Sequence, residues 1–115
     1  MRNDLQKRLF DFAVDVLKLL RTLPKQAELN VIKYQLAKSS TSSGANYEES
    51  QAGSSKADFR NKVRISLREM RESNYWLRIL KALEVEQISE EKLTNLIQES
   101  LELKKILGSI VTKTR

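Results

Sequence analysis

The feature that most limits how this chain can fold is a helical pattern of apolar and small residues that continues for about six turns. It covers residues 59–80, where these residues recur every three or four positions and therefore share one face of a helix. Its members are Phe59, Val63, Ser66, Leu67, Met70, Ser73, Asn74, Leu77 and Leu80. Only one proline and three glycines occur in 115 residues, so almost nothing interrupts helix elsewhere. The sequence therefore predicts an all-α fold.

We expect four helices, at residues 4–22, 26–51, 56–83 and 90–111, in a single domain that spans residues 1–115. Pro24 separates the first two helices, and Gly53 suits the C-terminal end of the second. Ser55 and Ser89 are good N-caps for the third and fourth. Because the connections are short, neighbouring helices should run in opposite directions, as an antiparallel up-down-up-down four-helix bundle.

The serine-rich run at residues 39–43 has the composition of a loop, because serine and threonine favour turns and caps. We nevertheless expect helix there, since the flanking apolar periodicity stays in register across it. Two interpretations of these serines remain open. Either they allow close helix packing, with hydroxyls bonded to the preceding turn, or they form a small polar site with Asn46 and a carboxylate.

Positive charge is concentrated in the third expected helix. Residues 54–82 contain eight basic and three acidic residues, a net charge of +5 out of +6 for the whole chain. On a helical wheel six cations share one face: Lys56, Arg60, Arg64, Arg68, Arg71 and Arg78. A one-signed face of this kind predicts binding to phosphate backbones, without readout of bases. The alternatives are a solvated face, or neutralisation by Glu69, Glu72 and the acidic fourth helix.

A further face of the same helix is apolar and carries Ile65, Trp76 and Ile79. Trp76 and Tyr75 are large amphipathic residues of the kind enriched at interfaces. A helix with two apolar faces usually has two partners, here its own bundle and a neighbouring subunit. We therefore expect Ile65, Tyr75, Trp76 and Ile79 at a homo-oligomer interface. The alternative is a four-helix core broad enough to bury both faces.

The chain contains no histidine and no cysteine. It therefore lacks the commonest general base, the commonest transition-metal ligands and any disulfide or thiol chemistry. Four glutamates of the central helices could hold Mg²⁺ or Mn²⁺ through oxygen ligands alone: Glu48, Glu49, Glu69 and Glu72. The stronger expectation is that they pair with the abundant arginines and lysines or cap the polar stretch of the second helix. The three glycines are isolated, so there is no phosphate-binding loop. We expect a protein that is not an enzyme and has no catalytic residue, metal or cofactor.

No stretch approaches the roughly 18 consecutive apolar residues of a membrane span. The N-terminal residues lack the unbroken apolar core of a signal peptide. We therefore expect no membrane partner and a cytoplasmic location.

Several motifs resemble those of a known family. They are SSTSSGANYEE at residues 39–49, SKADF at residues 55–59 and EMRESNYWL at residues 69–77. Together with Gln35, Leu36, Lys62, Ser66 and Leu67, they are similar to the bacterial four-helix bundle protein family, also called the 23S rRNA intervening-sequence protein family. The resemblance covers nearly the whole chain and is densest over residues 28–77.

The resemblance implies four antiparallel helices and assembly as a cyclic homopentamer. A related branch, the accessory protein of diversity-generating retroelements, is a basic pentamer that engages nucleic acid and a reverse transcriptase. Most members of the family have no established biochemical function. Two hypotheses follow for this chain. It is a homo-oligomer whose basic face binds RNA or DNA without sequence preference, or it is a scaffold that docks a partner protein and has no nucleic-acid role.

Overall fold

The computed structural model describes residues 2–53 and 55–115, and these residues form four helices and no strand. The helices are α1 (Arg2–Leu20), α2 (Ala27–Ser50), α3 (Lys56–Ala82) and α4 (Glu90–Lys113). The all-α prediction is confirmed. All four expected helices are present, with ends that differ from the expected ones by at most two residues.

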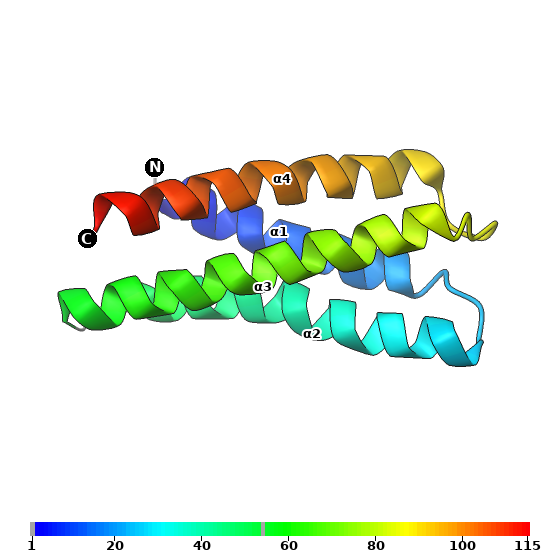
Figure 1. Cartoon of the computed structure of the whole chain (residues 1–115), viewed down its shortest axis with the longest axis horizontal. Helices are drawn as coiled ribbons and strands as arrows, with labels where there is room; N and C mark the ends of the chain where they lie inside the picture. Colours follow the sequence, from blue (N-terminus) through cyan, green and yellow to red (C-terminus); the bar gives the residue numbers. More distant parts are fainter. Residues whose placement is uncertain (1, 54) are drawn as a thin grey trace.

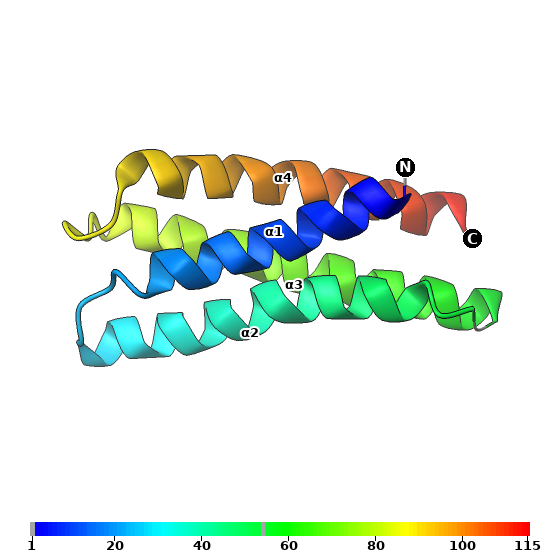
Figure 2. The ribbon, with the colours of Figure 1, turned by 180° about the vertical axis from the view of Figure 1, so that it is seen from behind.

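The four helices lie side by side in an elongated bundle of 45 × 23 × 19 Å. In Figure 1, α3 lies in front between α2 and α4, and Figure 2 shows α1 on the opposite side. The helix pairs in contact are α1 with α2, α2 with α3, α3 with α4, and α1 with α4. The two termini lie at the same end of the bundle as the connection between α2 and α3 (Figure 1). Each helix therefore packs against two others and leaves its outer side exposed.

Side-chain caps fix where α3 and α4 begin. The Ser55 hydroxyl accepts a hydrogen bond from the backbone N–H of Asp58 at 3.1 Å, and the Ser89 hydroxyl accepts one from Lys92 at 3.2 Å. Both caps were predicted from the sequence. Gly53 has a φ of +85°, in the left-handed region that favours glycine, so it suits the connection that follows α2.

The first helix begins and ends two residues earlier than expected. Residues 21 and 22 form a turn, and the hydroxyl of Thr22 donates to the backbone carbonyl of Leu19 at 2.7 Å. Threonine side chains compete in this way with regular helical bonding. Pro24 has no backbone N–H to bond the Leu20 carbonyl four residues earlier, so the helix ends at Leu20.

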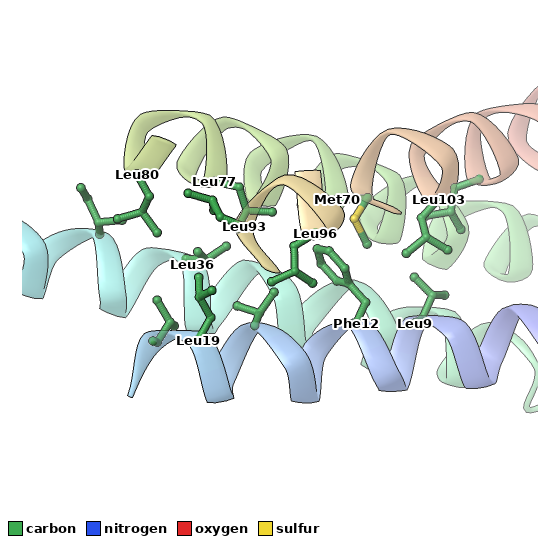
Figure 3. Close-up of a cluster of buried hydrophobic side chains, with 14 of the residues drawn as sticks. Leu9, Phe12, Leu19, Leu36, Met70, Leu77, Leu80, Leu93, Leu96 and Leu103 are labelled. Carbon is green, nitrogen blue, oxygen red and sulfur yellow. The ribbon is translucent and has the colours of Figure 1, made fainter. Parts of the chain in front are cut away.

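All four helices contribute to one cluster of buried apolar side chains. Figure 3 shows Phe12 of α1, Leu36 of α2, Met70 of α3 and Leu103 of α4 within it, and each is at most 2% exposed. Full burial of a large apolar side chain contributes about 1.5–3 kcal/mol relative to leaving it in water. The predicted stripe of α3 is buried throughout except at Phe59, which packs partly buried against the cluster.

The serine-rich run lies inside α2, which confirms the prediction of helix. The hydroxyl oxygens of Ser39 and Ser73 are 2.8 Å apart. Ser43 donates to the backbone carbonyl of Ser66 at 2.8 Å, and the hydroxyl of Ser66 donates to the carbonyl of Ser43 at 2.7 Å. The packing interpretation therefore holds, but the shortest bonds of the buried serines Ser39 and Ser43 cross to α3, whereas the exposed Thr41 bonds back to the Ala37 carbonyl at 2.8 Å. Small hydroxyls bring the two helices together while each buried polar atom keeps a partner.

The alternative of a small polar site built around Asn46 is not seen among the described residues. The amide of Asn46 donates to the backbone carbonyl of Ser42 at 2.9 Å and to its hydroxyl at 3.1 Å. These bonds stay within one turn of α2, and no carboxylate in residues 2–53 or 55–115 joins them.

Candidate nucleic-acid interface

The six cations predicted to contact nucleic acid lie along one outer side of α3, which we call the arginine face. Its members are Lys56, Arg60, Arg64, Arg68, Arg71 and Arg78. Five of them are exposed, while Arg60 is half-buried and its Nε atom has no hydrogen-bond partner among the described residues. Because a helix rises 1.5 Å per residue, the face extends about 27 Å from Arg60 to Arg78. That length matches several consecutive phosphates of a nucleic-acid strand.

A buried asparagine ties the arginine face to α4. Asn74 is 5% exposed, and its amide donates to the hydroxyl of Ser100 at 2.9 Å. Ser100 in turn donates to the backbone carbonyl of Ile97 at 2.7 Å. Arg78 donates through Nε to the Asn74 side-chain oxygen at 2.9 Å. The sequence showed Asn74 only as a polar member of the core stripe, and its i, i+4 spacing from Arg78 was the available signal for this link.

One alternative from the sequence was that the α3 carboxylates Glu69 and Glu72 neutralise these cations. Within the described residues, Arg68 is the one member of the arginine face that pairs with a carboxylate, at 3.5 Å from Glu69. The carboxylate of Glu72 instead accepts a hydrogen bond from the indole N–H of Trp76 at 3.1 Å. The α3 glutamates therefore leave most of the face unpaired.

The carboxylates of α4 that form ion pairs also bind cations outside the arginine face. Arg8 of α1 lies 2.7 Å from Glu99 and 3.1 Å from Glu102, and the hydrogen bond with Glu99 raises the pKa of Arg8 above its ordinary value. At the other end of α4, Glu90 lies 3.8 Å from Lys81. Within the described part of one chain, the positive charge of the arginine face is therefore largely uncompensated.

The four residues predicted at an oligomer interface occupy two different places. Ile65, Trp76 and Ile79 are half-buried, and Trp76 and Ile79 pack against the core cluster. Tyr75 is 47% exposed, and its ring lies under the guanidinium of Arg78, whose Cζ is 5.7 Å from the ring centroid. Tyr75 therefore belongs spatially with the arginine face. The role of all four residues in oligomerisation stays a prediction.

A groove of about 650 Å³ lies between α1 and α4, away from the arginine face. Its charged lining consists of three cations and three carboxylates: Arg8, Lys18, Lys92, Asp11, Asp15 and Glu99. Because these charges balance, the groove offers a polyanion no net attraction. The arginine face remains the better candidate for phosphate contacts.

Neither a metal-binding cluster nor a membrane-spanning helix is found in residues 2–53 and 55–115. No group of three or more histidine, cysteine, aspartate or glutamate side chains is placed to hold a metal ion. No described helix combines the length and apolar content that crossing a bilayer requires.

Comparison with known proteins identifies the family and supports the four-helix fold. The family model described as 23S rRNA-intervening sequence protein matches residues 1–109. A crystal structure from Bacteroides thetaiotaomicron, described as a protein with unknown function from the S23 ribosomal protein family, is 34% identical to this chain. The match covers 93% of this chain and 97% of that chain, with a TM-score of 0.82. No curated protein matches the chain. The similarity thus extends over the whole bundle and is not confined to the sequence motifs.

Proposed function

This chain belongs to the 23S rRNA-intervening sequence protein family, and we propose that it is a non-enzymatic homo-oligomer whose arginine face binds RNA or DNA without sequence preference. The similar solved protein has no known function. The proposal therefore rests on the surface of this chain. The observation that carries it is a one-signed face on α3 whose cations are mostly left without carboxylate partners.

The chemistry of the face suits a phosphate backbone. Five of its six members are arginines, whose planar guanidinium groups match phosphate oxygens in a two-point geometry. Cations that neutralise phosphates release condensed counterions, which supplies affinity irrespective of sequence and makes it sensitive to salt. One straight row of cations along a helix offers no set of side chains directed at base edges, so specificity for a base sequence is not expected.

The proposal includes a cyclic assembly, pentameric as the family resemblance implies, built from bundles whose neighbouring helices alternate in direction. Alternating direction is supported by the pairing of Ser39 with Ser73 and of Ser43 with Ser66, because numbers rise along α2 as they fall along α3. Assembly is supported by the indole of Trp76, which the single bundle buries only in part. Arginine faces repeated around a ring would bind one strand together and gain affinity through multivalency.

A second candidate function is a scaffold that docks a partner protein through apolar contacts. It is favoured by large apolar side chains on the outer surface of α1 and α2, where Phe10 is 60%, Val31 57% and Tyr34 66% exposed. Docking of this kind depends on apolar burial and is insensitive to added salt, whereas phosphate binding weakens steeply with salt. The two functions therefore differ in a measurable property.

The test of the proposed function is a double charge reversal, Arg64→Glu with Arg68→Glu, compared with Lys18→Glu with Arg21→Glu. All four residues are exposed, and both pairs change the net charge equally, so they differ chiefly in the surface that is altered, with the loss of the Arg68–Glu69 ion pair as a smaller difference. We expect the first pair to weaken binding to labelled RNA and DNA strands by about 100-fold or more, because two attractive contacts become repulsive. The control pair should change affinity by less than about threefold, since its charges act from a distance and are screened.

Circular dichroism of both double variants should show the helical content of the unaltered protein, since no core residue is changed. Retained binding by the Arg64 and Arg68 variant would show that the arginine face is not the site. Equal losses from both pairs would show a response to net charge alone.

A further inference from the structure

We infer that Tyr75 and Arg78 form a stacking platform for an unpaired base, so that the arginine face prefers single-stranded nucleic acid to duplex. This inference rests on the proposed function and names the form of nucleic acid that the face takes. It depends on three features: the place of Tyr75 among the arginines, the contacts that hold its ring, and the anchoring of Arg78.

Tyr75 is an exposed aromatic residue set within a row of cations. It follows Arg71 by four residues and precedes Arg78 by three, so all three side chains lie on one side of α3. Its side chain is 47% exposed although it is large and partly apolar. Exposed aromatic rings between cations are the combination that single-strand-binding surfaces use, with rings stacking on bases and cations contacting phosphates.

The tyrosine ring is held by its neighbour in the chain. The rings of Tyr75 and Trp76 meet edge to face, with centroids 5.2 Å apart and planes inclined by 73°. The indole of Trp76 is fixed in turn by its hydrogen bond to Glu72 at 3.1 Å, and it packs partly buried against the core. These contacts favour one orientation of the Tyr75 ring before any ligand arrives.

The arginine of the platform is also fixed in advance. The Nε of Arg78 donates a hydrogen bond to the side-chain oxygen of Asn74. Asn74 is buried, and its amide donates a hydrogen bond to Ser100 of α4. The terminal nitrogens of Arg78 form no hydrogen bond with the described residues, and its Cζ lies 5.7 Å from the Tyr75 ring centroid. A flat guanidinium and a flat ring thus stand together on the surface with little freedom left to lose on binding.

Only unpaired bases can stack on such a platform. A base in a duplex is already stacked on its neighbours and shielded by them, so only the phosphates of a duplex are accessible to this side of α3. A base of a single strand can stack on the tyrosine ring or on the guanidinium plane while the neighbouring phosphates contact the other arginines. The preference for single strands should therefore depend on Tyr75 and not on the overall charge.

The test compares Tyr75→Leu, Tyr75→Phe and the control Tyr34→Leu. Tyr34 is a 66% exposed tyrosine on α2 that has no ring contact and no cation over its ring among the described residues. The ligands are an oligothymidine strand, an abasic strand of equal length that carries phosphates without bases, and a blunt duplex. Fluorescence polarisation at one salt concentration gives each affinity.

We expect Tyr75→Leu to lower affinity for the oligothymidine strand by about tenfold and to leave duplex and abasic-strand affinities unchanged, because stacking is lost while every cation remains. Tyr75→Phe keeps a stacking ring and should bind like the unaltered protein, as should Tyr34→Leu. The chain has a single tryptophan, next to Tyr75 in sequence and in space, so oligothymidine should change Trp76 fluorescence and the abasic strand should not.

Equal binding of oligothymidine and the abasic strand would overturn the inference and leave the proposed phosphate-binding function intact. Equal losses for strand and duplex in Tyr75→Leu would do the same, because they would show a general effect on the face. Failure of the unaltered protein to bind any of the three ligands would overturn both the inference and the proposed function.

Discussion

Two sides of α3 differ in chemistry. One is the arginine face, and the other, which we call the tryptophan flank, carries Ile65, Trp76 and Ile79. The arginine face borders α4, to which Arg78 is linked through Asn74. The tryptophan flank borders α2, since Trp76 lies about one turn beyond Ser73, whose hydroxyl meets α2.

The two α3 glutamates outside the first turn belong to the tryptophan flank. Glu72 bonds to the indole of Trp76, and Glu69 is half-buried one turn before Ser73. A helix surface selected only for solubility intersperses charges of both signs. Six of the eight α3 cations lie instead on the arginine face, while the opposite side carries mainly apolar residues and carboxylates, the pattern expected of a helix that meets two different partners. In the proposed function, the arginine face binds a polyanion and the tryptophan flank binds a second copy of the chain, and both roles stay predictions.

We expect the largest effect, on the oligomeric state, from Trp76→Ala, which removes the largest side chain of the tryptophan flank. We expect the oligomer to dissociate into smaller species in light scattering or analytical ultracentrifugation, because truncation of a central tryptophan commonly costs 2 kcal/mol or more at an interface. Nucleic-acid affinity should fall as well, since linked arginine faces are lost and the Tyr75 ring loses its edge-to-face contact with Trp76. The matched control is Phe10→Ala on α1, where an aromatic side chain is 60% exposed. Dissociation by the control and not by Trp76→Ala would place the subunit interface on α1.

A smaller effect is expected from Ser43→Val. This substitution disturbs the packing of α3 on α2, and with it the orientation of the arginine face and the tryptophan flank relative to the rest of the bundle. Valine adds volume where Ser43 is fully buried, and it removes the bond to the Ser66 carbonyl. Overpacking costs about 1–3 kcal/mol and the lost hydrogen bond about 1 kcal/mol, so unfolding free energy should fall by about 2–4 kcal/mol in urea titrations. Thr41→Val is the control, because Thr41 is exposed and its hydroxyl bonds only within its own helix. Equal stability of the two variants would mean that the serine contacts do not hold α3 in place.

Periodicity predicted the helices and the buried stripe of α3 because burial of one face follows directly from spacing along a regular helix. The caps at Ser55 and Ser89 were equally predictable, since a cap depends on residues close in sequence. The bonds between serines of α2 and α3 were not predictable, because they depend on the register between two helices, which packing of the whole core determines.

The candidate site was predicted in part. The arginine face follows from helical spacing alone, and the exposure of five of its six members agrees with it, while Arg60 is half-buried. The residue type of Tyr75 indicates an interface, which stays a prediction, whereas its spacing of four and three residues from Arg71 and Arg78 places it beside the arginine face. Arg78 is linked through Asn74 to Ser100. Asn74 and Ser100 are 26 positions apart in the sequence, so no local pattern could show their hydrogen bond.

The most direct test of the central claim, that the arginine face binds nucleic acid, is the affinity of the unaltered protein for RNA and DNA strands across a salt series, with the mass of the protein measured in solution alongside. If three or more cations contact phosphates, the logarithm of the binding constant should fall against the logarithm of salt with a slope of about −2 or steeper on single strands. The protein should have the mass of a ring. Absence of binding at low salt, or binding that salt does not weaken, would contradict the claim and leave the arginine face without a phosphate-binding role.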